Sequence, residues 1–236
     1  MIWLRSFIFA LGQWLFTPVF CTLILLIFPL SPQRRYRIIT IWARSMLWWL
    51  TLTCGIRYRV IGADNIPKEP CIVLSKHQSA WETLAFQKIL PPQVWVLKRE
   101  LLWLPFFGWG LALTSPIAIN RSAGREALKQ LVEQGKDRLA KGFCVVVFPE
   151  GTRIAPGEMG KFHIGGAWLA AHSGTPALPV ALNAGEHWGK NSFLKKPGTI
   201  TVSIGQPIAT QGMKPDALNK QVEAWIAAEM PRLKSL

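Results

Sequence analysis

A histidine and a glutamate lie five positions apart in the segment Ser75–Glu82, directly after a short β-branched run. An imidazole whose orientation is fixed by a carboxylate is a general base that can take a proton from a hydroxyl group near neutral pH. In that arrangement Glu82 would hold the tautomer of His77 and stabilise the imidazolium that forms. The residue types and their spacing therefore indicate base catalysis on a hydroxyl.

The same glutamate also fits a helix cap. Ser79 and Glu82 have the spacing of a capping box, in which the glutamate accepts a hydrogen bond from the backbone N–H of the serine. Spacing alone supports both interpretations equally. The two roles are compatible, because a glutamate in the first turn of a helix can face the loop that precedes it.

Polar residues also follow the apolar run 143–148. The turn after it contains Glu150, Gly151, Thr152 and Arg153. A glycine turn exposes backbone N–H groups, and a guanidinium fork suits a phosphate. Lys98 and Arg121 each follow another predicted strand. One such basic residue alone is typical of a solvated surface, but their shared position at strand ends favours an anion site.

The sequence lacks the motifs of several other chemistries. It contains no G-x-S-x-G, no G-x-x-x-x-G-K-[ST], and no G-x-G-x-x-G after a predicted strand, which disfavours a serine hydrolase, an ATPase and a dinucleotide enzyme. Its 4 cysteines form no C-x-x-C pair and have no histidine at metal-ligand spacing. Neither a disulfide scaffold nor a structural zinc site is therefore expected.

The basic residues are unevenly distributed along the 236-residue chain, whose net charge is +14. Residues 1–63 contain seven arginines and no acidic residue, whereas residues 64–236 contain 20 basic and 13 acidic residues. Such an excess fits nucleic acid, an anionic membrane or a phosphorylated substrate. Because the first arginines lie among tryptophans and leucines, we expect a membrane surface as the partner and no nucleic acid.

The N-terminal quarter has the composition of a membrane segment. Residues 6–33 carry no charge, and the apolar run 7–30 would span about 36 Å as a helix, against about 30 Å for a hydrocarbon core. A basic cluster at 34–37 follows, and then a second apolar stretch over 38–56. We predict a helical hairpin in one leaflet, or a spanning helix followed by an interfacial one; a buried core helix is the alternative. The basic cluster favours the cytoplasmic side for the rest of the chain.

The remainder, residues 57–236, is predicted to be an α/β domain with a largely parallel sheet flanked by helices, and residues 1–56 to be a membrane-anchoring hairpin. Strands are expected over 57–61, 71–75, 94–97, 117–120, 143–148, 177–182 and 199–204, and helices over 80–90, 123–140, 161–172 and 215–232. Ligands of such sheets bind beyond the carboxyl ends of the strands. That edge is where His77 and the Glu150 turn belong.

These blocks resemble those of the glycerolipid acyltransferases, most closely the bacterial 1-acylglycerol-3-phosphate acyltransferase branch. The likeness rests on His77-x4-Glu82 and on the string Phe148-Pro-Glu-Gly-Thr-Arg153. Two weaker blocks agree in order, Lys98-Arg-Glu-Leu101 with Arg121 and Leu178-Pro-Val180, so the resemblance covers about residues 57–205. The family usually has aspartate where this chain has Glu82, which puts the geometry and the substrate range in question.

The resemblance implies transfer of a fatty acyl group from a thioester of CoA or acyl carrier protein to the hydroxyl of lysophosphatidic acid, giving phosphatidic acid. His77 would be the base and Glu82 its positioning partner, with direct attack on the thioester and with no metal or cofactor. Lys98 lies in the block containing Arg121. Arg121, Glu150, Gly151, Thr152 and Arg153 would hold the acceptor, with Glu150 accepting hydrogen bonds from Arg153 or the glycerol.

Two alternatives to an enzyme that acylates lysophosphatidic acid remain open at this stage. The acceptor could be glycerol 3-phosphate, another lysophospholipid or an aminoacyl lipid, or the chain could be a catalytically silent lipid-binding protein. The aromatic stretch 101–113 could line an acyl groove or only pack in the core. For a bacterial chain the resemblance implies the inner membrane, with the catalytic domain on its cytoplasmic face.

Overall fold

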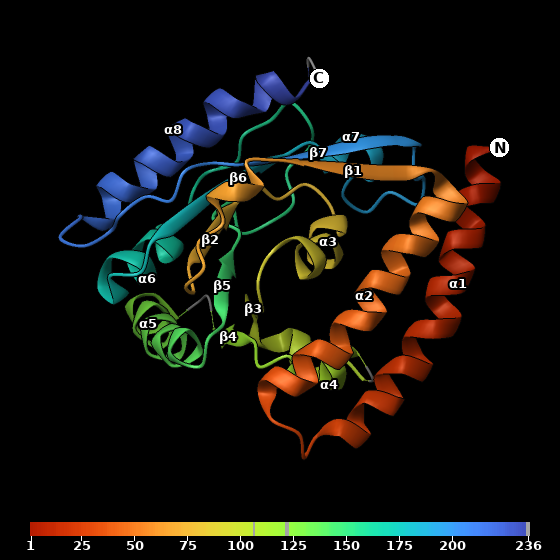
Figure 1. Ribbon diagram of the computed structural model, residues 1–236, viewed down its shortest axis with the longest axis horizontal. Coiled ribbons are helices and arrows are strands. Elements are labelled where there is room, and N and C mark those ends of the chain that lie inside the picture. Colours follow the sequence, from red (N-terminus) through yellow and green to blue (C-terminus); the bar gives the residue numbers. More distant parts are fainter. Residues whose placement is uncertain (106, 121–122, 235–236) are drawn as a thin grey trace.

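The computed structural model describes residues 1–105, 107–120 and 123–234 (Figure 1). Within these residues seven strands form one sheet in the order β1-β7-β6-β2-β5-β3-β4. The strands are β1 Ile56–Ile61, β2 Ile72–Ser75, β3 Gln93–Lys98, β4 Ile117–Ile119, β5 Cys144–Val147, β6 Ala177–Leu182 and β7 Gly198–Ile204. All neighbours are parallel except β6 and β7. The prediction of a largely parallel sheet is confirmed.

The central strand β5 explains why the sheet needs helices on both faces. Its side chains alternate between two cores, because successive residues of a strand point to opposite faces. Cys144 and Val146 belong to the core that contains Trp81 of α3, whereas Val145 and Val147 belong to the core under α5, α6 and α8. A strand buried on both faces reads as a continuous apolar run, which is how it appears in the sequence.

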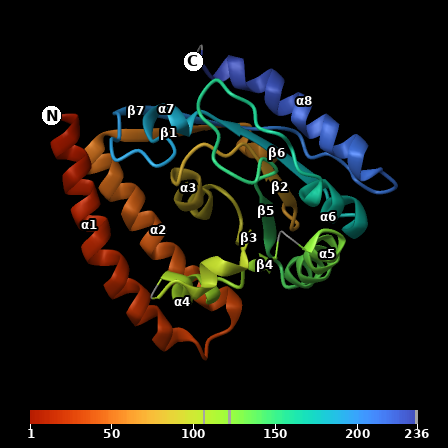
Figure 2. The same ribbon diagram turned by 180° about the vertical axis from the view of Figure 1, so that it is seen from behind.

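The helices divide between the two faces of the sheet. The helices are α1 Ile2–Leu23, α2 Pro32–Cys54, α3 Trp81–Ile89, α4 Phe107–Ala112, α5 Arg125–Ala140, α6 Gly165–Ser173, α7 Ala184–His187 and α8 Pro215–Lys234. In Figures 1 and 2, α5, α6 and α8 lie on the side of the sheet opposite to α1 and α2. The short helices α4 and α7 were not predicted, because six and four residues are too few to show a helical period.

Helix α6 begins at Gly165, later than the predicted start at Lys161. The backbone N–H groups before it are bonded elsewhere: Gly160 donates to the Glu150 carboxylate and His163 donates to the carbonyl of Pro149. These contacts hold residues 160–163 as a loop against the turn that follows β5. The apolar pattern there reflects packing of a loop and not the first turn of a helix.

Helices α1 and α2 pack side by side as the predicted hairpin (Figure 1). Pro32 is the first residue of α2, where its missing N–H costs nothing, and Gly55 ends the helix at φ +68°, a conformation that favours glycine. Helix α1 begins before the apolar run, at Ile2. It can include Arg5 because the Nε of Arg5 donates to the carbonyl of Thr53, 2.6 Å away at the C-terminal end of α2.

One face of the hairpin is apolar and exposed. Its most exposed side chains include Trp14 at 80%, Leu26 at 77% and Phe28 at 68%. Residues Ile2–Ile27 are the one helical stretch of the described chain that is long and apolar enough to cross a membrane, by length and composition only, and 11% of its most apolar window is buried. The opposite side of α2 supplies Met46 and Leu50 to the same core as Trp81. The hairpin and the sheet therefore share one hydrophobic core, which contains residues from both sides of the predicted boundary at residue 56.

Candidate active site

The predicted site forms where β2 and β5 end. These strands are adjacent and parallel, so the loops after Ser75 and Val147 meet at one edge of the sheet. The ring of His77 stacks on the ring of Phe148 with centroids 3.8 Å apart and planes 12° apart. The backbone carbonyl of His77 also accepts a hydrogen bond from the N–H of Ile154. The two chemical motifs of the sequence are thus one structural unit.

The position of Glu82 is compatible with both of the roles that its spacing suggested. Its side chain is fully buried, and its Oε2 lies 3.5 Å from Nδ1 of His77. The same carboxylate accepts hydrogen bonds from the backbone N–H groups of Gln78 and Ser79 at 2.9–3.0 Å. The distance to His77 is long for a strong hydrogen bond, so the carboxylate acts on the ring mainly through charge and position. The Nε2 of His77 is then the nitrogen left for a substrate.

The structure suggests a test of how the length of the Glu82 side chain affects catalysis. We expect Glu82→Asp to lower kcat moderately, because the carboxylate would keep its backbone donors but retreat from His77. Glu82→Ala should lower kcat by about 10²-fold or more, because it removes the orientation of the base. The matched control is Ser79→Ala, which removes only the hydrogen bond from the N–H of Trp81 to Ser79 Oγ at the same helix start. If Glu82→Ala and Ser79→Ala lower kcat equally, Glu82 is only a cap.

Glu150 has partners that the sequence did not predict. Its Oε1 accepts hydrogen bonds from Nζ of Lys76 at 2.5 Å and from the N–H of Gly160 at 2.8 Å, and its Oε2 accepts one from the N–H of His77 at 3.2 Å. The side chains of Lys76 and Glu150 are both fully buried. Glu150 thus ties the loop of His77 to the segment before α6, and Arg153, which was one of its two expected partners, is not among its described hydrogen-bond donors.

Two of the predicted basic residues line a cavity together with His77. His77, Gly151, Arg153 and Lys98 all line it. Gly151 has φ +68°, so the turn that presents Arg153 needs a residue without a Cβ. Thr152 is exposed, and its Oγ1 accepts a hydrogen bond from Nζ of Lys190 at 3.2 Å. The predicted ligand Arg121 lies outside the described residues.

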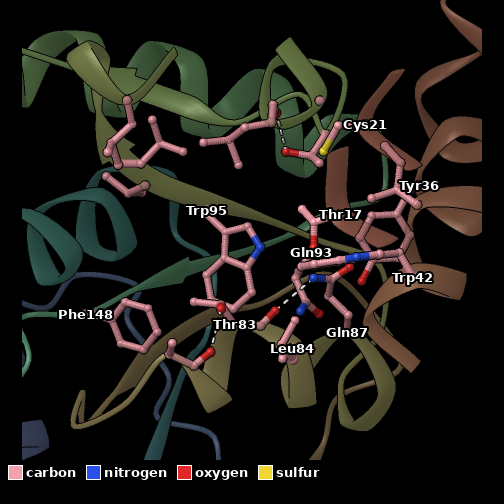
Figure 3. Close-up of a pocket in the computed structure, with 18 of the residues that line it drawn as sticks. Thr17, Cys21, Tyr36, Trp42, Thr83, Leu84, Gln87, Gln93, Trp95 and Phe148 are labelled. Atoms are coloured by element: carbon pink, nitrogen blue, oxygen red, sulfur yellow. Dashed lines mark hydrogen bonds between the residues drawn. The ribbon is translucent and has the colours of Figure 1, made fainter. Parts of the chain in front are cut away.

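The cavity runs from His77 toward the hairpin and has a volume of about 500 Å³. Trp95 and Phe148 form one wall near His77, with ring centroids 5.7 Å apart (Figure 3). From the stretch 101–113, Leu101 and Leu111 line the cavity, whereas Leu113 is buried in a small core with Ile24 and Ile39. The stretch 101–113 therefore contributes residues both to the cavity and to a core.

Two residues of the site escaped sequence reasoning. Lys76 was visible in the string before His77, but nothing in the sequence pairs it with a glutamate 74 positions away. Lys190 lies in a loop after α7 and carries no motif. Among the described residues no group of three or more His, Cys, Asp or Glu side chains could hold a metal ion.

Comparisons with known proteins agree with this arrangement. Residues 57–183 match the family model described as Acyltransferase. The 1-acyl-sn-glycerol-3-phosphate acyltransferase of Pseudomonas aeruginosa is 49% identical over 92% of this chain and 87% of its own length, and the alpha enzyme of that name from Mus musculus is 34% identical over 69% and 58%. The crystal structure of the 1-acyl-sn-glycerophosphate acyltransferase of Thermotoga maritima has the same fold, with a TM-score of 0.81 at 22% identity over 99% of this chain and 96% of that one. This chain therefore belongs to the acyltransferase family of enzymes.

Proposed function

We propose that the protein transfers a fatty acyl group from a thioester to the free hydroxyl of lysophosphatidic acid, forming phosphatidic acid. The observation that carries this proposal is that His77, which lies 3.5 Å from Glu82, lines a largely apolar cavity together with Arg153 and Lys98. A base, an acyl-sized groove and cations for a phosphate lie together there. The names of the Pseudomonas and mammalian relatives support the same acceptor.

The chemistry needs one proton to move twice. The Nε2 of His77 takes the proton of the acceptor hydroxyl as its oxygen attacks the thioester carbonyl, and the imidazolium is stabilised by the Glu82 carboxylate. The C–O bond of the new ester forms and the C–S bond breaks. The departing thiolate takes the proton from His77 and leaves as a thiol. No acyl-enzyme is required, so the site needs no activated serine or cysteine.

The basic side chains in and beside the cavity suit an acceptor that carries a phosphate group. Arg153 offers a planar fork of N–H donors. Lys190, from the loop after α7, donates a hydrogen bond to Thr152 in the same turn as Arg153. The Glu150 carboxylate adds little opposing charge, because it is paired with the buried ammonium group of Lys76. The turn after β5 therefore presents net positive charge to the acceptor.

Removal of the positive charge of Arg153 should affect the KM values of the two substrates differently. We expect Arg153→Ala to raise the KM of the lysophospholipid at least tenfold while the KM of the thioester changes less than threefold, because a charge-assisted bond to phosphate is lost. Steady-state kinetics with each substrate varied in turn measure both values. Arg57→Ala, an exposed arginine on β1, is the control and should leave both unchanged. A larger rise in the KM of the thioester would move the phosphate site elsewhere.

The substrates are identified by an assay of the full chain in lipid or detergent. Lysophosphatidic acid, glycerol 3-phosphate and other lysophospholipids are each offered with an acyl-CoA and with an acyl carrier protein thioester. Fastest turnover of lysophosphatidic acid supports the proposal and identifies the donor. Faster turnover of another acceptor would keep the chemistry and replace the acceptor. Absence of turnover from folded protein with every pair would contradict the proposed activity.

The exposed apolar face of the hairpin supports attachment to the membrane that dissolves both lipids. Trp14, Leu15 and Phe16 of α1 are each at least 60% exposed, which no aqueous surface favours. The basic cluster at 34–37 supports a cytoplasmic, anionic leaflet. Flotation of the full chain with vesicles containing phosphatidylglycerol tests this attachment, and recovery of the protein only in the vesicle-free fractions would contradict it.

A further inference from the structure

The cavity that leaves His77 does not end in an apolar floor. Buried polar atoms without a hydrogen-bond partner in the described chain gather at its far end: both amide atoms of the Gln93 side chain, the indole Nε1 of Trp42 and the Oγ1 of Thr17. The hydroxyl of Tyr36 lies with them, against the backbone of Gln93. These residues come from β3, α2 and α1, and Figure 3 shows them grouped away from Phe148. A polar cluster of this size in a largely apolar cavity needs water or the polar atoms of a ligand to satisfy its hydrogen bonds.

Gln93 is the centre of this group. On β3 it shares the inner face with Trp95 and Leu97, which line the apolar part of the cavity, and its side chain is fully buried. A purely packing role at that position would favour an apolar residue. Burial also raises the pKa of Tyr36 above its ordinary value, so the phenol keeps its proton and can donate. The cluster therefore offers donors from Trp42 and Tyr36 and both a donor and an acceptor from Gln93.

The nature of the ligand follows from the position of the cluster. Both water and an oxygen on an acyl chain can satisfy the cluster, whereas a methylene or methyl group that displaces water leaves several polar atoms unpaired. A site built to hydrogen-bond a hydroxyl rejects the analogue that lacks it far more strongly than an apolar pocket rejects a hydroxyl. The cluster thus distinguishes an oxygen-bearing chain from a plain one of the same length.

We propose that Gln93, Trp42 and Tyr36 form a polar subsite of the acyl groove that binds an oxygen substituent, such as a hydroxyl, on the acyl chain of the donor. Gln93 is then a specificity-determining residue. The substrate class is an acyl thioester with a hydroxyl far from the thioester carbon. This inference rests on the proposed function, because it assumes that the cavity holds the acyl chain.

Paired donors test the subsite. Saturated acyl thioesters of increasing length are compared with the same chains carrying a terminal hydroxyl, on the carrier that supports turnover of lysophosphatidic acid. For each chain length we take kcat/KM of the hydroxylated donor divided by kcat/KM of the plain donor. In the wild type this ratio should be largest at the chain length that reaches Gln93. Gln93→Leu should lower that maximum at least tenfold, mainly by improving use of the plain chain.

Two further variants separate the subsite from a general disturbance of the cavity. Gln87→Leu makes the same side-chain change in the same cavity, but the Gln87 amide already donates to the carbonyl of Thr83, so the ratio should stay within about twofold of wild type. Tyr36→Phe removes one donor with little change of volume and should lower the ratio in part, which keeps the test valid if Gln93→Leu does not fold. A ratio that is flat with chain length, or equal in wild type and both subsite variants while turnover persists, would overturn the subsite alone. Absence of turnover with every donor would overturn the proposed function as well.

Discussion

Replacement of His77 by alanine is expected to lower kcat for acyl transfer by about 10²–10⁴-fold while the fold and the membrane attachment remain. The loss follows from geometry, because His77 is the one titratable side chain of the described site that lines the cavity and lies against a buried carboxylate, 3.5 Å from Glu82. Its ring is held between that carboxylate and the face of Phe148. Among the described residues that line the cavity, His77 is the one histidine.

The matched control is His172→Ala. His172 is exposed on α6 and its Nδ1 contacts the carbonyl of Trp168, so its removal should leave kcat unchanged. Initial rates with lysophosphatidic acid, circular dichroism and vesicle flotation are measured for both variants. Activity of His77→Ala within tenfold of wild type would contradict the assignment of the base. Unfolding of His77→Ala would instead show that the stacked ring mainly holds the turn after β5.

The sheet was predictable because its strands carry a strong local signal. Short β-branched runs such as Cys144–Val147 separate helical stretches, and each of the seven predicted strands is present, with ends that differ by at most two residues. The α6 start was not predictable, because Gly160 and His163 leave the helical pattern only through bonds to the distant turn at Glu150. Apolar periodicity does not record contacts of that kind.

The candidate site also contains residues that were predictable from the sequence and residues that were not. His77, Glu82 and Arg153 were predictable because chemistry requires their types at strand ends. The function of Glu150 was not, because its partner Lys76 is remote in sequence and a buried cation has no periodic signature. The two roles of Glu82 were predicted to be compatible, and the structure places one carboxylate against both the N–H of Ser79 and the ring of His77. Sequence thus identifies groups that react, and tertiary structure identifies those that hold them.

Loss of either partner of the Lys76–Glu150 pair is expected to lower the free energy of unfolding by about 3–5 kcal/mol, because it leaves an uncompensated buried charge. For a chain of this length that corresponds to a fall in Tm on the order of 10 °C. Lys76→Met and Glu150→Gln are the single variants. Glu150→Gln should also lower kcat, because the carboxylate holds the backbone N–H of His77 and of Gly160 in place.

A double-mutant cycle separates the pair from its surroundings. If the charges stabilise each other, Lys76→Met combined with Glu150→Gln should be less destabilised than the sum of the single variants, by about 1–3 kcal/mol. Thermal unfolding in one detergent measures all four proteins. Lys141→Met, which breaks the exposed pair with Asp137, is the control and should cost less than about 0.5 kcal/mol. Additive losses at Lys76 and Glu150 would contradict a direct pair. The loop of His77 would then be held by backbone hydrogen bonds to Glu150, with Lys76 only filling space beside them.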